Sequence, residues 1–160
     1  MFKPLSITLP SDREIVVTRE FNAPRDLVFD CWTIPALIRR WLGPADWVMT
    51  TCDFDARVGG KWRFVSRGPD GFEMASGGTI SEFIRPEWMK TTELYDIDWT
   101  GGETINSNRF TEAAGITTSV LTVLYATKQA RDGARATPMA EGMEMGFVRL
   151  DEMLADMPAY

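Results

Sequence analysis

The sequence predicts an α+β fold in which a curved antiparallel sheet wraps around a long C-terminal helix. Residues 47–127 read as a succession of strands joined by short turns, which is typical of an antiparallel meander. Residues 138–157 form the clearest amphipathic helix in the chain, with its apolar residues on one side. One helix cannot cover a flat sheet of this length, so we expect the sheet to curl around it.

The N-terminal part predicts one strand and two short helices. Residues 13–21 form the strand, because β-branched residues occupy its centre at 15–18. Pro24 stands where the first helix opens, and Pro35 opens a second helix that runs to Trp41. We therefore expect a compact helix pair between the first strand and the meander.

Six strands and two further helices follow. Gly77-Gly78 interrupts one strand and predicts a bulge or bend. After a weak helical segment at 128–135, Thr137 stands as the expected N-cap of the last helix, with Pro138 next. The expected strands of the meander are Trp47–Phe54, Lys61–Arg67, Phe72–Ile84, Trp88–Asp96, Thr104–Glu112 and Ile116–Thr127.

Length and charge limit the possible functions. The 160 residues fit one domain, 1–160, with a core at about 13–157. The net charge of −6 argues against nucleic acid as a partner, because binding it needs a basic face. The N-terminus lacks the continuous apolar core of a signal peptide, and no stretch approaches a membrane span. We expect a cytoplasmic protein with no membrane insertion.

Histidine is absent from the sequence, and cysteine occurs only at 31 and 52. The absence of histidine excludes serine–histidine and cysteine–histidine catalysis. Two cysteines this far apart make a zinc site and a disulfide framework poor expectations. No glycine-rich phosphate loop is present. We therefore expect no metal and no cofactor.

Several motifs together resemble a known family. They are Phe21-Asn22-Ala23-Pro24-Arg25 with Leu27-Val28-Phe29, then Trp32-Thr33, Pro35, Arg40-Trp41 and Gly43-Pro44, then Gly59-Gly60 with Trp62-Arg63 and Arg67-Gly68-Pro69-Asp70-Gly71, and finally Gly142-Met143-Glu144 with Gly146 and Leu150. This set resembles the AHSA1-like (activator of Hsp90 ATPase homologue 1-like) family of the START-like, SRPBCC (Bet v 1-like) superfamily. The resemblance implies a helix-grip fold and a cavity for a small hydrophobic molecule between the sheet and the last helix.

The sequence departs from the family pattern in three places. Ile34 stands where aspartate is common, so the second helix lacks a capping side chain. Leu42 and Phe147 each replace a frequent tryptophan. Because the change at 147 alters the shape of the cavity, we do not carry a ligand over from relatives.

The expected cavity lining combines aromatic residues with one face of the last helix. Trp62 and Phe64 alternate on one strand, and we expect that face to point inward. Gly146 lies in the middle of the apolar stripe, where it either packs closely on a strand or leaves room for a ligand. We expect the second, with the cavity wall thinnest there. The predicted lining is Trp32, Trp41, Trp62, Phe64, Phe83, Tyr95, Asn108, Phe110, Met143, Gly146, Phe147 and Leu150.

Three functions remain open. The first is a binding protein for a small apolar or aromatic molecule. The second is a cyclase or hydrolase that uses Glu93 with Arg109 as its electrostatic partner, although residues of this type more often lie on a solvated sheet face. The third is a chaperone-interacting protein, as the family name implies. We expect a monomer or a weak homodimer, since Met145 and Val148 lie opposite the apolar stripe of the last helix.

Overall fold

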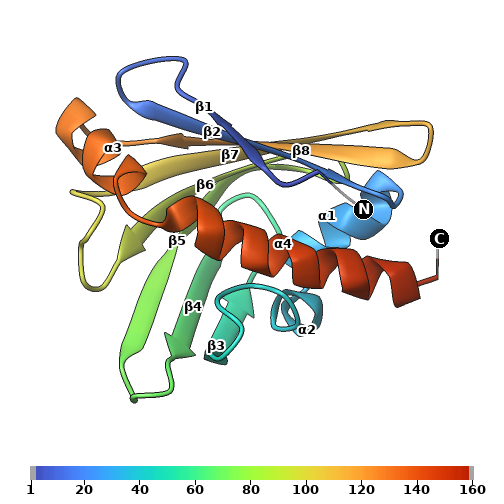
Figure 1. Ribbon diagram of the computed structural model, residues 1–160, viewed down its shortest axis with the longest axis horizontal. Coiled ribbons are helices and arrows are strands. Elements are labelled where there is room, and N and C mark those ends of the chain that lie inside the picture. The colour runs from blue at the N-terminus through green and yellow to red at the C-terminus, as the bar shows by residue number, and fades with distance from the viewer. Residues whose placement is uncertain (1–2, 159–160) are drawn as a thin grey trace.

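The computed structural model describes residues 3–158 and contains one sheet, a pair of short helices and a long C-terminal helix (Figure 1). This arrangement confirms the predicted fold class. The elements are β1 (Ser6–Thr8), β2 (Glu14–Phe21), α1 (Arg25–Thr33), α2 (Pro35–Ile38), β3 (Val48–Phe54), β4 (Lys61–Arg67), β5 (Glu73–Ile84), β6 (Trp88–Tyr95), β7 (Thr104–Ala113), β8 (Ile116–Leu124), α3 (Lys128–Arg135) and α4 (Met139–Asp156).

The eight strands form one antiparallel sheet in the order β1-β2-β8-β7-β6-β5-β4-β3. From β3 to β8 each strand pairs with the next in the chain, as expected for a meander. The helices α1 and α2 connect β2, near one edge, to β3 at the other. The sheet curls so that α4 crosses its concave side (Figure 1).

The strand β5 contains a close backbone contact and a register shift. A Cβ atom on Gly78 would collide with the backbone carbonyl oxygen of Thr92 on β6, so this close approach requires glycine. A few residues further on, the pairing of β5 with β6 shifts register between Ile80 and Glu82. The pairing is regular at Gly77-Gly78, so the irregularity predicted there lies further along the strand, between Ile80 and Glu82.

A buried arginine on β2 links α4 to the sheet through two ion pairs. Arg19 lies on the inner face of β2 and is only 2% exposed. Its guanidinium donates hydrogen bonds to Glu144 at 2.8 and 3.2 Å and to Asp151 at 2.8 and 3.0 Å, two turns further along α4. Burial alone would raise the pKa of Glu144, but the Arg19 guanidinium and the backbone N–H of Leu5 outweigh it and hold that pKa below its ordinary value.

Local details differ from the expectations in three places. The three-residue strand β1 was not predicted, because so short a segment has no readable alternation. Thr137 does not cap α4: its hydroxyl donates to the carbonyl oxygen of Ala134 and closes α3 instead. The helix α2 ends at Ile38 rather than Trp41, and it has no side-chain cap, as Ile34 predicts.

Candidate functional site

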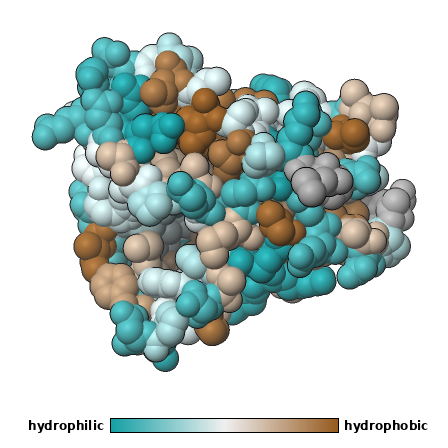
Figure 2. Space-filling model, in the orientation of Figure 1, coloured by the Kyte–Doolittle hydropathy of each residue, from teal (hydrophilic) through white to brown (hydrophobic). Residues whose placement is uncertain are grey.

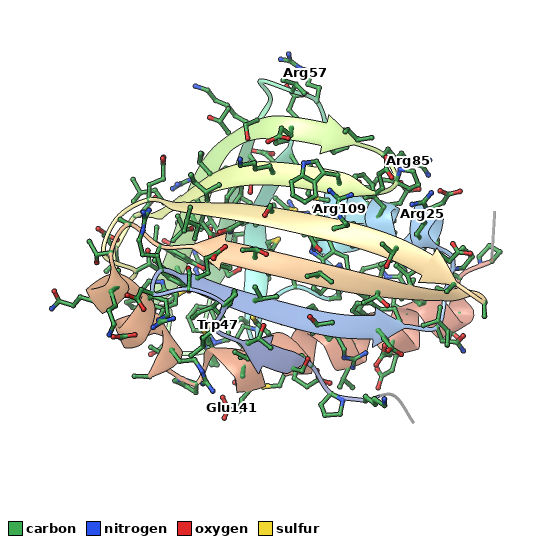
Figure 3. The ribbon with its side chains drawn as sticks, turned by 90° about the horizontal axis from the view of Figure 1, so that it is seen from above. Arg25, Trp47, Arg57, Arg85, Arg109 and Glu141 are labelled. Carbon is green, nitrogen blue, oxygen red and sulfur yellow. The ribbon has the colours of Figure 1, made fainter. Side chains whose placement is uncertain are left out.

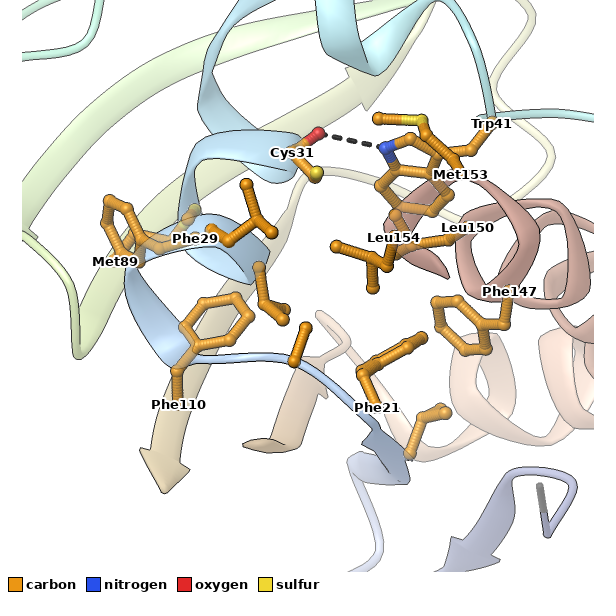
Figure 4. Packing of buried hydrophobic residues seen from close by; sticks show 14 of the residues in the cluster. Phe21, Phe29, Cys31, Trp41, Met89, Phe110, Phe147, Leu150, Met153 and Leu154 are labelled. Atoms are coloured by element: carbon orange, nitrogen blue, oxygen red, sulfur yellow. Dashed lines mark hydrogen bonds between the residues drawn. The ribbon is translucent and has the colours of Figure 1, made fainter. Parts of the chain in front are cut away.

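The interior has a densely packed half near α1. Trp32 lies 4.7 Å from Trp41 and 5.2 Å from Phe110, measured between ring centroids. The indole N–H of Trp41 donates to the carbonyl oxygen of Cys31 at 2.8 Å (Figure 4). Phe110 is fully buried, so it contacts no water-sized space. This half of the predicted lining is core: it comprises Trp32, Trp41, Phe110, Phe147 and Leu150, and Phe83 joins it through Phe29.

The other half of the interior is the concave side of the central strands. We call it the β4–β7 inner face. The strand registers place Trp62 opposite Gly78, Phe64 opposite Ser76, and Glu93 opposite Thr104, all pointing to the side of α4. The sequence predicts that Trp62 and Phe64 point inward, and this placement agrees with that prediction. Trp62 is only 6% exposed. The inner face consists of Trp62, Phe64, Ser76, Thr91, Glu93, Tyr95, Thr104, Asn106 and Asn108.

Glu93 is the acidic residue of the β4–β7 inner face. The side-chain amide of Asn106 donates to Glu93 Oε1 at 3.1 Å, and the hydroxyl of Thr104 fixes that amide by donating to Asn106 Oδ1 at 3.1 Å. Burial raises the pKa of Glu93, and the hydrogen bonds from Asn106 and Ser76 offset only part of that rise. The carboxyl group is therefore easier to protonate than an exposed glutamate.

The negative charge of Glu93 contributes to the raised pKa values of two tyrosines, Tyr95 and Tyr125. Burial raises the pKa of Tyr125 to about 12, and the negative charge of Glu93 adds to the effect. Burial raises the pKa of Tyr95 further, again with a contribution from Glu93. Within residues 3–158 neither phenol hydroxyl has a hydrogen-bond partner. Both hydroxyls can therefore bond to another molecule.

Glu93 and Tyr95 are half-buried on the β4–β7 inner face. Both side chains keep some exposed area, yet burial is the main cause that raises their pKa values. Phe64 and Met143 are also only partly buried, as are Trp32 and Phe83 beside the aromatic core near α1. Phe64, Glu93, Tyr95 and Met143 therefore each keep some exposure to solvent.

Asn108 marks the inner boundary of this region. It is 2% exposed, and its Oδ1 accepts a hydrogen bond from Ser119 at 2.9 Å. Its Nδ2 is buried and has no partner among the described residues. A buried donor without a partner costs about 1–3 kcal/mol, so a water or a ligand acceptor at this atom would be favourable.

Arg109 does not belong to the site. Its neighbours Asn108 and Phe110 point inward, so Arg109 points outward, where its guanidinium stacks on Trp88 at 4.5 Å (Figure 3). The predicted pairing of Arg109 with Glu93 is therefore wrong, because successive residues of a strand face opposite sides. The carboxylate–guanidinium pair on which the enzymatic alternative depended is absent from this inner face.

Gly146 does not leave room for a ligand. A Cβ atom at this position would lie 3.0 Å from the carbonyl oxygen of Trp41 and 3.6 Å from its ring. The glycine thus allows α4 to pack on the segment after α2, and the expectation of a thin wall here is wrong. The side chain of Arg149 strengthens the same contact by donating to the carbonyl oxygens of Trp41 and Gly43.

Gly146→Leu should lower the free energy of unfolding by about 1–3 kcal/mol, because leucine overpacks this contact. Gly142→Leu is the matched control: nothing lies within 4 Å of a Cβ atom there. That variant should gain up to about 1 kcal/mol from the better helix propensity of leucine. Urea denaturation of both variants measures the difference. Equal effects at the two positions would contradict the close packing of Gly146.

Glu93→Gln should stabilise the protein increasingly as the pH rises. The pKa of Glu93 is raised in the folded protein above its ordinary value of 4.5, so the folded state binds the proton more tightly. Stability is then lost as the pH rises through the folded pKa, and glutamine removes that loss. Thermal unfolding of both proteins from pH 4 to about 8 tests the prediction. A variant less stable than the parent at the alkaline end would contradict it.

Two surface hollows lie away from the inner face. The larger, of about 630 Å³, opens on the solvent side of α4 between Leu5, Ala45 and Val148. Met145 and Val148 are exposed there, as expected, and Figure 2 shows that hydrophobic residues on this side of the molecule are scattered among hydrophilic ones. Within residues 3–158 no helix has the length and hydropathy to cross a membrane, and no three His, Cys, Asp or Glu side chains gather as a metal site.

Sequence reasoning missed several residues near the site. Arg19 shares the inward phase of Val17 and Phe21, so strand alternation was a usable signal for an inward charge. Tyr125 follows the last strand, and its proximity to Glu93 depends on the curl of the sheet. Nothing in the sequence gives the distance between these two residues.

Comparison with known proteins places the chain in a family. The family model described as Activator of Hsp90 ATPase homolog 1-like protein matches residues 22–155. A solved protein from Rhodobacter sphaeroides is 34% identical, with a TM-score of 0.93, over 97% of this chain and 100% of that one. A comparison with curated proteins gives no match.

More distant structures share the fold. A protein from Mycobacterium smegmatis is 23% identical, with a TM-score of 0.84, over 97% of this chain and 99% of that one. The AHSA1 protein from Silicibacter pomeroyi is 21% identical, with a TM-score of 0.72, over 89% of this chain and 97% of that one. The motifs, the curled sheet gripping α4 and the match over residues 22–155 lead to one conclusion: the chain belongs to the Activator of Hsp90 ATPase homolog 1-like family.

Proposed function

We propose that the protein binds a small, mainly apolar molecule in the recess between the β4–β7 inner face and α4. The observation that carries the proposal is the partial exposure of Phe64, Glu93 and Tyr95 on a face that protein otherwise surrounds. Ligand sites of this type are apolar hollows with a few polar groups that fix orientation. The backbone of α4 stands off from the strands, and long side chains bridge the two, which favours an adaptable wall.

The polar groups of the recess would orient the ligand. Tyr95 and Tyr125 offer hydroxyls, and Asn108 offers a buried N–H that lacks a partner. Met143 is partly buried on α4 and supplies a flexible side chain on the opposite wall. Discrimination between ligands would then come from shape, together with these few hydrogen bonds.

Fluorescence of the neutral apolar probe N-phenyl-1-naphthylamine tests the proposal. We expect saturable binding at about one probe per chain. Thr91→Trp places a large side chain on the inner face beside Glu93 and should abolish binding, whereas Leu94→Trp on the outer face should not. Thermal unfolding of both variants confirms that they are folded. Probe binding that is equal in the two variants, or absent from the parent protein, would refute the proposed site.

A further inference from the structure

We propose that the ligand of the recess is a cation: an apolar or aromatic molecule with a protonated amine, whose charge Glu93 accepts. The inference rests on the proposed function and names the class of ligand. Glu93 is the one charged side chain on that face as defined above, and none of the ion pairs among residues 3–158 includes it.

The groups that contact Glu93 orient its carboxylate without neutralising it. Asn106 and Ser76 are neutral hydrogen-bond partners, and Thr104 holds the amide of Asn106 in place. Two other carboxylates with little exposure to solvent each have an arginine partner. Asp30 is paired with Arg85 at 3.0 Å, and Asp151 is paired with Arg19 at 2.8 Å. Burying an ionised carboxylate without a nearby cation is unfavourable in free energy. The inner face therefore lacks a positive charge that would balance Glu93.

Aromatic residues lie on the same inner face as Glu93. The indole N–H of Trp62 crosses β5 and donates to the carbonyl oxygen of Thr92, next to Glu93, at 3.1 Å. The ring of Phe64 lies 4.9 Å from that of Trp62. The negative charge of Glu93 contributes to the raised pKa values of Tyr95 and Tyr125. The faces of aromatic rings attract ammonium groups. A carboxylate among aromatic rings therefore suits an amine that carries an apolar body.

The other ligand classes fit this surface less well. An anion would be repelled by Glu93 and by the net charge of −6. A neutral apolar molecule would cover the carboxylate and leave its charge unpaired. A molecule that joins an ammonium group to a phenyl or alkyl body satisfies both the charge and the apolar surface.

Three probes of equal length test the inference: 4-phenylbutylamine, 4-phenylbutan-1-ol and 4-phenylbutyrate, each titrated at pH 7 by displacement of N-phenyl-1-naphthylamine. The amine should bind at least about tenfold more tightly than the alcohol, and the carboxylate should bind weakest. Glu93→Gln should weaken the amine by at least about tenfold and change the alcohol by less than about twofold. Glu82→Gln, an exposed glutamate on the outer face of β5, is the matched control and should change neither.

A second measurement uses the unmodified protein and does not depend on the folding of any variant. Affinity for the amine should fall as the pH is lowered and Glu93 becomes protonated, whereas affinity for the alcohol should stay constant. Equal binding of amine and alcohol, or an unchanged amine affinity in Glu93→Gln, would overturn the inference and leave the proposed function in place. Failure of the parent protein to bind any probe would contradict the proposed function as well.

Discussion

Arg19→Met should lower the free energy of unfolding by about 3–5 kcal/mol, which is the largest effect expected from a single charge in this protein. The substitution leaves Glu144 and Asp151 facing each other across a buried site that has lost its cation. It also releases the midpoint of α4 from β2. Urea denaturation at neutral pH measures the loss, and the triple variant Arg19→Met, Glu144→Gln, Asp151→Asn should recover much of it.

Arg63→Met is the control for this prediction. Arg63 also makes two short hydrogen bonds to one carboxylate, Asp96, at 2.6 and 2.7 Å, but both partners are exposed to solvent. An exposed pair of this kind contributes only about 0–1 kcal/mol. If Arg19→Met cost no more than Arg63→Met, Arg19 would not be the attachment point of α4.

Phe147→Ala should cost about 3–5 kcal/mol, because the ring fills the centre of the core. Phe147 is 4% exposed, and its ring lies 5.6 Å from that of Phe21 and 6.1 Å from that of Trp41. The guanidinium of Arg19 lies 5.8 Å from the same ring, so the truncation also removes packing beside the buried ion pairs. Differential scanning calorimetry should show a large fall in Tm.

Phe147→Leu separates a core residue from a residue of the recess. It keeps most of the apolar volume and should cost only about 1–2 kcal/mol. Because Phe147 is buried in the aromatic core near α1, the affinity for N-phenyl-1-naphthylamine should not change. A clear change in probe affinity in this stable variant would place Phe147 in the ligand site.

The sequence was sufficient for the fold and for part of the site. Proline and glycine positions, strand alternation and the apolar stripe of the last helix each report local geometry, and these signals located every element except β1. The inward phase of Trp62 and Phe64 followed from the same alternation. The outward orientation of Arg109 follows from the same alternation, because its neighbours Asn108 and Phe110 are predicted to face the interior.

The remaining features depend on tertiary contacts that no local pattern encodes. Gly146 is explained by the carbonyl oxygen of Trp41, more than a hundred residues away in the chain. The aromatic core depends on how seven rings, contributed by distant parts of the chain, pack near α1. Likewise, the environment of Glu93 is set by residues from β5, β7 and the end of β8. Such distances follow only from the curl of the whole sheet.

The position of a bound probe tests the central claim most directly. Isotope-filtered NMR of the labelled protein with unlabelled 4-phenylbutylamine records which protein protons lie near the probe. We predict contacts to Trp62, Phe64 and Tyr95 on the β4–β7 inner face. Contacts confined to Met145 and Val148, in the hollow on the solvent side of α4, would contradict the claim.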